Sequence, residues 1–130
     1  MPKVPVSVKG VLLVEGKVLL LRNERGEWEL PGGRMDPGES HAQTLAREFR
    51  EELSIDVELL DLIDSYEFEV IPSKYVRIVT YGCRLRGAFK PALSEEHKEF
   101  DLHAVADLEN IAVPVGYVRS IKSWSMHAES

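Results

Sequence analysis

The chain has 130 residues, of which 44% are hydrophobic and 29% charged, and its formal net charge is −6. This composition predicts one domain, spanning residues 1–130, with a single hydrophobic core. The basic footprint needed to bind polymeric nucleic acid is absent. No apolar run is long enough to cross a bilayer. We therefore expect a soluble, cytoplasmic protein without a membrane partner, and a homodimer is compatible with this composition.

Strands are predicted along most of the chain, separated by short turns. Val4–Val14 and Lys17–Arg22 flank a Glu15-Gly16 turn, which predicts a hairpin. Further strands are predicted at Trp28–Leu30, Val57–Val70, Tyr75–Leu85 and Phe100–Val105. Loops are predicted at Pro31-Gly32-Gly33, Asp36-Pro37-Gly38 and Arg86–Glu96.

The clearest predicted helix follows the second of these loops. Ser40 is a good N-cap, and Gln43, three residues later, completes a capping box. Large apolar residues recur every four positions from Leu45 to Leu53, which predicts one buried face. The helix is expected to end near Ser54.

A second helix is predicted over Tyr117–Met126, because Val118, Ile121 and Trp124 are spaced by three. Strands on either side of a central helix, with another helix at the end, indicate a mixed α/β domain. The only cysteine, Cys83, cannot form an intramolecular disulfide and falls within a predicted strand. We therefore expect it to be buried.

Three carboxylates share one face of the central helix. Glu48, Glu51 and Glu52 stand at i, i+3 and i+4. At about 6 Å and an effective dielectric of about 20, each pair of like charges costs roughly 3 kcal/mol. A bound divalent cation would reverse that sign, and magnesium prefers oxygen ligands. The alternative is a solvated acidic face partly neutralised by Arg47 and Arg50, and the three glutamates alone favour this alternative.

The surrounding residues shift the balance, because the stretch Gly33–Ile55 resembles the Nudix box. That motif reads Gly, five residues, Glu, seven residues, Arg-Glu-aliphatic-x-Glu-Glu-x-Gly-aliphatic. Its matching positions in this chain are Gly33, Glu39, Arg47, Glu48, Glu51, Glu52 and Ile55. A chance match at a given start has odds of about 1 in 10 million.

Two positions depart from the motif. Ser54 stands where the family has glycine, a residue suited to a left-handed conformation just past a helix end. A serine there should cost on the order of 1 kcal/mol. Phe49 fills a position that is usually aliphatic. We expect both departures to affect packing and local turn geometry rather than chemistry.

The resemblance implies a Nudix-type fold, an α/β/α sandwich around a mixed β-sheet. It also implies substitution at phosphorus by water, with Mg²⁺ or Mn²⁺ bridging the enzyme and a diphosphate. The metal ligands implied by the motif are the Gly32 carbonyl, Glu48, Glu51, Glu52 and Glu39. Glu39 is equally well interpreted as an anchor of the helix terminus.

Further roles follow from the same resemblance. Arg47 is expected to orient a catalytic glutamate by a charge-assisted hydrogen bond; the alternative is an ordinary i,i+4 pair with Glu51. Gly33 is expected to allow close backbone approach to the substrate. Arg22 and Arg34 are candidate phosphate contacts, although an ordinary surface position is the simpler interpretation for each.

The general base varies within this family. It is a box glutamate, such as Glu48 or Glu51, or a residue of the loop before the last strand. In that loop Glu96 and His97 are the candidates, within a charged run that is more often simply solvated. Tyr75, Tyr81 and Phe100 are candidates for stacking on a base, although strand aromatics more often belong to the core.

The predicted activity is hydrolysis of the diphosphate linkage in a nucleoside diphosphate derivative. A nucleotide-sugar or ADP-ribose substrate is slightly favoured, because Trp28–Leu30 and Pro114–Tyr117 resemble that side of the family. The alternative substrate is a nucleoside triphosphate, as in MutT-like pyrophosphohydrolases. A non-catalytic nucleotide sensor would not need the three glutamates. A prenyl diphosphate isomerase would need a catalytic cysteine, a role that does not fit Cys83.

Overall fold

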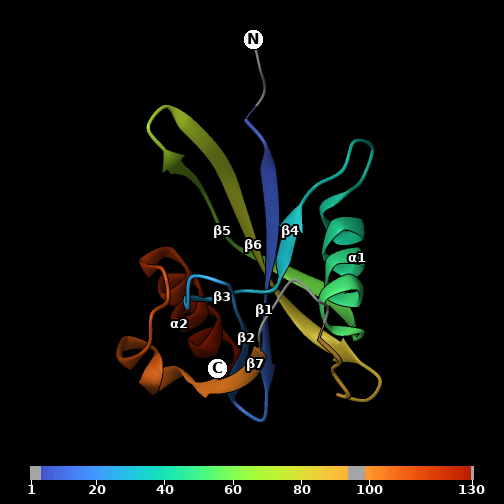
Figure 1. The fold of residues 1–130 in the computed structure, drawn as a ribbon. Coiled ribbons are helices and arrows are strands. Elements are labelled where there is room, and N and C mark those ends of the chain that lie inside the picture. The colour runs from blue at the N-terminus through green and yellow to red at the C-terminus, as the bar shows by residue number, and fades with distance from the viewer. Residues whose placement is uncertain (1–3, 94–98, 130) are drawn as a thin grey trace.

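The computed structural model describes residues 4–93 and 99–129 (Figure 1). Its strands are β1 (Val6–Val14), β2 (Lys17–Arg22), β3 (Trp28–Glu29), β4 (Gly32–Arg34), β5 (Asp56–Ile71), β6 (Lys74–Arg86) and β7 (Glu99–Ala104). Its helices are α1 (His41–Leu53), the 3-10 helix η1 (Val105–Asn110) and α2 (Val115–Glu129). Figure 1 shows α1 and α2 on opposite sides of the strands. This is the α/β/α arrangement that the sequence predicts.

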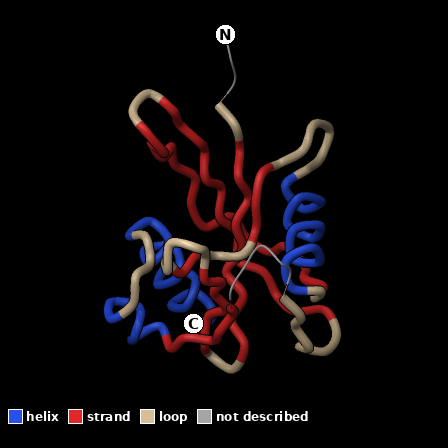
Figure 2. Tube along the Cα trace, viewed as in Figure 1, coloured by secondary structure: helices blue, strands red, loops and turns tan. Residues whose placement is uncertain are grey.

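β1 organises the seven-stranded mixed sheet. It runs parallel to β6 from Val6 to Leu12 and antiparallel to β4 from Ser7 to Lys9. Its end pairs antiparallel with β2, which also pairs with β3 and β7. β5 and β6 form a long antiparallel hairpin, which extends beyond the two helices in Figure 2. The N-terminal half of β1 therefore lies beside the segment that opens the Nudix-like motif.

The structure has two hydrophobic cores, one on each face of the sheet, rather than the single core that the composition predicts, because side chains alternate between the two faces along β1. Val8 and Leu12 pack on the α1 side, in the cluster that contains Phe49. Val11 packs on the α2 side, in the cluster that contains Trp124. Complete burial of such side chains contributes roughly 1.5–3 kcal/mol each. These two cores hold both helices to the sheet and fix their orientation.

The predicted caps of α1 are confirmed. Ser40 Oγ accepts from the Gln43 N–H at 3.1 Å, and Gln43 Oε1 accepts from the Ser40 N–H at 2.8 Å. Ser54 adopts the left-handed conformation, with φ of 57°, and its N–H donates to the Arg50 carbonyl at 3.0 Å. The serine thus takes the conformation for which the family uses glycine.

The predicted loop at Pro31-Gly32-Gly33 is wrong, because Gly32 and Gly33 belong to β4 and pair with β1. Gly32 has φ of +132°, and a Cβ there would collide with the Val8 carbonyl oxygen. Because it lacks a Cβ, Gly32 permits close pairing between β4 and β1, although a Pro-Gly-Gly sequence usually indicates a turn. The other predicted strands and helices agree with the structure within about three residues, whereas η1 lies in a segment for which no helix is predicted.

Within residues 4–93 and 99–129, neither α-helix is long and apolar enough to cross a membrane.

Candidate active site

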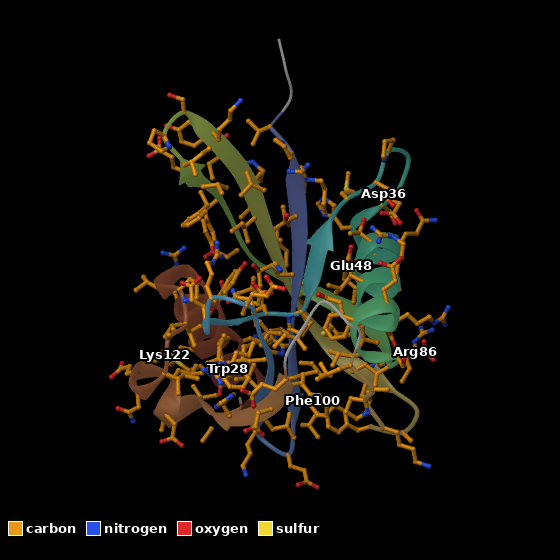
Figure 3. All side chains as sticks on the ribbon, viewed as in Figure 1. Trp28, Asp36, Glu48, Arg86, Phe100 and Lys122 are labelled. Carbon is orange, nitrogen blue, oxygen red and sulfur yellow. The ribbon has the colours of Figure 1, made fainter. Side chains whose placement is uncertain are left out.

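Two glutamates of α1 are directed at β4. Glu52 is buried, with 6% of its surface exposed, and its Oε1 accepts from the Gly32 N–H at 2.8 Å. Glu48 lies against Gly33 so closely that a Cβ on that glycine would be 2.6 Å from the Glu48 Cδ. Figure 3 shows Glu48 between α1 and β4. The Glu52 carboxylate therefore contacts Gly32, and the Glu48 carboxylate contacts Gly33.

Both carboxylates are in surroundings that disfavour negative charge. Burial raises the pKa of Glu52 to about 8, although the Lys9 ammonium and the Gly32 N–H act in the opposite direction. Burial also raises the pKa of Glu48, against the lowering effect of Arg47. Glu48 further raises the pKa of Glu52 through charge repulsion, and Glu51 does the same to Glu48. The pair would therefore be stabilised as carboxylates by additional positive charge.

Arg47 contacts acidic side chains both on α1 and in the loop before it. Its Nε donates to Glu39 Oε2 at 2.7 Å, and its Nη1 donates to Glu48 Oε1 at 2.9 Å. The same Nη1 reaches Glu51 Oε2 at 3.2 Å, and Nη2 donates to the Arg34 carbonyl at 3.0 Å. This contact set exceeds an ordinary i,i+4 pair. Arg47 ties the loop before α1 to the helix and orients Glu48.

The space in front of these carboxylates is a pocket of about 500 Å³, which we call the acidic pocket. Its lining residues come from β4, α1 and the segment around β3: Asn23, Glu24, Arg25, Glu29, Gly32, Gly33, Arg34, Glu48 and Glu52. Glutamate and arginine residues thus line the same volume. That combination suits a divalent cation beside an anionic ligand.

A second hollow of about 510 Å³, which we call the aromatic cleft, lies on the α2 side of the sheet. Its aromatic lining residues are Trp28, Tyr66, Phe68 and Tyr117. Asn23, Arg25 and Glu29 line both this cleft and the acidic pocket. The two spaces are therefore neighbours with a common border, and one extended ligand can reach both.

The NUDIX domain profile matches residues 3–122 of this sequence. The chain belongs to the NUDIX domain family.

The relatives include a CTP pyrophosphohydrolase and an ADP-ribose pyrophosphatase. Residues of this chain are 37% identical over 68 residues to the CTP pyrophosphohydrolase of Escherichia coli K12, covering 48% of this chain and 50% of that protein. They are 50% identical over 48 residues to the mitochondrial ADP-ribose pyrophosphatase of Rattus norvegicus, covering 37% of this chain and 13% of that protein. This chain thus spans half or less of the length of these curated relatives.

The fold is similar to that of a MutT protein from Methanosarcina mazei Go1, whose crystal structure superposes with a TM-score of 0.81. The two sequences are 25% identical, and the superposition covers 97% of this chain and 96% of that one. Sequence and fold therefore agree on the Nudix assignment. Nudix hydrolases split pyrophosphate bonds, and glutamate and arginine residues line the acidic pocket of this chain.

The structure brings together some of the predicted Nudix site residues and separates others. Gly32, Gly33, Arg34, Glu48 and Glu52 all line the acidic pocket. The pocket lining does not include Glu51, Glu39 or Arg22 among the described residues. The two other candidate bases, Glu96 and His97, lie outside the described residues.

The separated residues have identifiable contacts. The Glu51 side chain is 59% exposed and is held by Arg47. Glu39 accepts from the Asp36 N–H and from Thr44 Oγ1 as well as from Arg47, and these bonds, with Arg47 first, lower its pKa to about 2. These contacts support the anchor interpretation of Glu39. Arg22 donates to Glu99 Oε1 at 2.7 Å across the β2–β7 pair.

The residues fit a divalent cation, although with few protein ligands. Within the described part of the chain, no three His, Cys, Asp or Glu side chains gather as a metal-binding group. Two carboxylates, Glu48 and Glu52, share the pocket with the backbone of Gly32. Magnesium commonly binds through one or two carboxylates, with waters and substrate phosphates completing its shell. The pair of carboxylates described above supplies such a set.

Several pocket residues were not among the predicted site residues. Lys9 and Tyr117 line the aromatic cleft, and Glu29 lines both spaces. The sequence does single out Lys9, because it is the only charged residue of β1. Of the predicted stacking candidates, Tyr81 and Phe100 instead pack against the α1-side core.

Proposed function

We propose that this chain is a divalent-metal-dependent hydrolase that cleaves the diphosphate linkage of a nucleoside diphosphate derivative. A nucleotide-sugar or ADP-ribose type of substrate is slightly favoured. The observation that carries the proposal is the common border of the acidic pocket and the aromatic cleft, at Asn23, Arg25 and Glu29. A substrate with a charged centre and an aromatic end matches that pair of spaces.

The acidic pocket is the proposed place of reaction. Glu48, Glu52 and the Gly32 carbonyl would hold Mg²⁺ or Mn²⁺, which supplies charge neutralisation at the diphosphate and a water of lowered pKa. Arg47 keeps Glu48 in place through the 2.9 Å bond between its Nη1 and Glu48 Oε1. Arg34 lines the same pocket, and its guanidinium is the proposed contact for diphosphate oxygens.

The aromatic cleft is the proposed place for the nucleoside. Its volume of about 510 Å³ falls within the range of small-molecule sites. Trp28 and Tyr117 present ring surfaces against which a base can stack, a contact that contributes roughly 0.5–1.5 kcal/mol beyond area burial. The second group of the substrate would then extend past the acidic pocket toward solvent.

The alternative substrate is a nucleoside triphosphate, and the similarity to the Escherichia coli CTP pyrophosphohydrolase favours it. A third alternative is a nucleotide sensor without turnover. The presence of the motif glutamates Glu48 and Glu52 in the acidic pocket argues against a sensor, because a protein that only binds the nucleotide need not retain them. The buried, unreactive position of Cys83, whose pKa burial raises to about 12, argues against prenyl isomerisation.

A substrate panel tests the proposal. ADP-ribose, a UDP-sugar and CTP are each incubated with the protein and Mg²⁺ or Mn²⁺ in ¹⁸O-water, and the products are identified by mass. Cleavage of ADP-ribose to AMP and ribose 5-phosphate, with one ¹⁸O incorporated, is the expected result. Turnover of CTP alone, to CMP and pyrophosphate, would support the triphosphate alternative. Binding without turnover of any of them would support the sensor.

A further inference from the structure

Lys9 occupies a central position on β1. Its backbone pairs with Gly32 on β4 and is aligned with Thr80 on β6, so strands hold it on both sides. Alternation along β1 directs its side chain to the α2 side of the sheet, opposite to Val8. On that side it lines the aromatic cleft. A charged residue at the centre of an apolar strand costs desolvation, which calls for a compensating role.

The Lys9 ammonium lies at the border of the two spaces. Its Nζ donates to the Leu30 carbonyl at 3.2 Å and to the Gly32 carbonyl at 3.4 Å. It also lies 5.9 Å from the centre of the Tyr117 ring, in the aromatic cleft. Gly32 lines the acidic pocket, so one side chain contacts elements of both spaces.

Four side chains act electrostatically on this ammonium. Burial acts to lower the pKa of Lys9, but Tyr117 and the carboxylates of Glu29, Glu52 and Glu48 raise it overall. The ammonium therefore stays charged across the neutral pH range. It is a fixed positive charge beside the acidic pocket, and its contacts to two backbone carbonyls hold it there.

We propose that Lys9 is a substrate-binding residue that contacts the diphosphate at the border of the two spaces, and that its charge weakens divalent-cation binding before substrate arrives. This inference rests on the proposed function. Lys9 lines the aromatic cleft and contacts the Gly32 carbonyl, and Gly32 lines the acidic pocket, so the ammonium lies where a ligand spanning both spaces would place its diphosphate. Lysine binds phosphate as a point charge. The Gly32 carbonyl, a proposed metal ligand, already accepts from Lys9, so the two cations compete for one oxygen.

The proposal predicts effects of opposite sign on two ligands. Loss of the ammonium should weaken substrate binding, because a positive charge facing the diphosphate disappears. It should tighten binding of a divalent cation to the substrate-free protein, because repulsion between like charges disappears. A lysine that only supports the local fold would, when replaced, weaken both.

The test compares Lys9→Met, which keeps the length and removes the charge, with Lys9→Arg, which keeps the charge. Lys17→Met, at an exposed lysine of β2 that lines neither space, is the matched control. Mn²⁺ affinity is measured in substrate-free protein by electron paramagnetic resonance, and independently by the rise of the Tm with Mn²⁺ concentration. The steady-state KM and kcat are then measured on the substrate identified by the panel.

For Lys9→Met we expect at least about threefold tighter Mn²⁺ binding and at least about tenfold higher KM. Lys9→Arg should restore Mn²⁺ affinity toward wild type, and Lys17→Met should change neither value. Weaker or unchanged Mn²⁺ binding by Lys9→Met would overturn the inference, and so would an unchanged KM. If the wild type turns over nothing, the proposed function fails, while the Mn²⁺ comparison still decides whether Lys9 opposes the cation.

Discussion

The backbone N–H of Gly32 donates to Glu52 Oε1 at 2.8 Å, which joins the last turn of α1 to β4. The bond holds a buried carboxylate at the edge of the acidic pocket, next to Glu48. Burial opposes the charge of Glu52, whereas this bond and the Lys9 ammonium favour it, and the core beneath α1 fixes the helix that carries it. A carboxylate held in this way is preorganised for a cation.

Replacement of Glu52 by Gln should separate activity from folding. The amide oxygen of Gln can still accept from the Gly32 N–H, but the negative charge that would hold the cation is lost. We expect kcat to fall by at least about 100-fold, the scale of removing a main electrostatic contributor. The Tm should stay the same or rise. Glu109→Gln, at an exposed glutamate paired with Lys122, is the control. Near-normal turnover by Glu52→Gln would rule out a central role for this residue.

The same glutamate should make stability depend on pH in the metal-free protein. In the unfolded chain a glutamate loses its proton near pH 4.5, whereas burial raises the pKa of folded Glu52 to about 8. Between these values the folded state binds more protons, so the free energy of unfolding falls as pH rises. Each pKa unit corresponds to about 1.4 kcal/mol, so the loss amounts to a few kcal/mol at most.

Thermal melts in chelator from pH 5 to pH 8.5 measure this effect. The wild-type Tm should decrease across the window, and Glu52→Gln should show a shallower slope. Equal slopes for the two proteins would show that Glu52 is ionised normally in the folded state.

Local sequence was sufficient to predict α1 and its carboxylates. The cap at Ser40 and Gln43 depends on residues three apart, and Glu48 and Glu52 lie on one helix face because of helical geometry alone. Local sequence was insufficient for β4, because Gly32 and Gly33 become a strand only when β1 lies beside them. The residues that specify α1 are close together in the sequence, whereas β4 depends on a strand that is distant in the sequence.

The aromatic cleft shows the same limit more strongly. Trp28, Tyr66 and Tyr117 come from three distant segments and meet only after the sheet and α2 have assembled. No spacing rule connects them, so the cleft could not be predicted from periodicity. Lys9 was the exception with a visible signal, since an isolated charge within an apolar strand indicates a buried partner.

Arg47 should be sensitive even to replacement by lysine. Its Nε and both terminal nitrogens form separate bonds, to Glu39, Glu48 and the Arg34 carbonyl among others, and a single ammonium cannot reproduce that fork. We expect Arg47→Lys to destabilise the protein by about 1–3 kcal/mol and to lower kcat by at least about tenfold. Urea unfolding and steady-state rates on the same preparation measure both.

Arg50→Lys is the matched control for Arg47→Lys. Arg50 lies on the same helix and pairs with Asp56, but both side chains are largely exposed. Such a pair contributes about 0–1 kcal/mol, so this variant should resemble wild type. If Arg47→Lys also resembled wild type, the ordinary i,i+4 interpretation would be correct.

Activity should require a divalent cation. The pKa values of Glu48 and Glu52 in the acidic pocket are raised, so their negative charge is already disfavoured before an anionic substrate binds. The arginines that line the pocket neutralise only part of the combined negative charge. Mg²⁺ or Mn²⁺ should support turnover, and removal with chelator should lower it by at least about 100-fold. Restoration on adding back the metal is the control for irreversible damage. Full activity in metal-free protein would contradict the proposed function.

Gly33→Ala tests the position of Glu48, whose carboxylate supplies the three atoms nearest to the new Cβ. Gly33 does not require a positive φ, so alanine is compatible with the backbone, but the new Cβ would lie 2.6 Å from the Glu48 Cδ. The carboxylate ends a flexible side chain and can move aside at little cost, so we expect the Tm to change by only a few degrees. The displaced carboxylate leaves the cation position, so kcat/KM should fall by at least about tenfold.

Gly38→Ala provides the opposite pattern as a control. Gly38 has φ of +83°, and no atom of the described residues beyond its chain neighbours lies within 4 Å of where the alanine Cβ would stand. Alanine there introduces backbone strain without touching Glu48. That strain costs on the order of 1 kcal/mol, and it should lower the Tm while leaving kcat/KM near wild type. Loss of activity only in Gly33→Ala, with loss of stability mainly in Gly38→Ala, would assign the catalytic effect to the position of Glu48. Equal activity in both variants would mean that the contact between Gly33 and Glu48 is not needed for turnover.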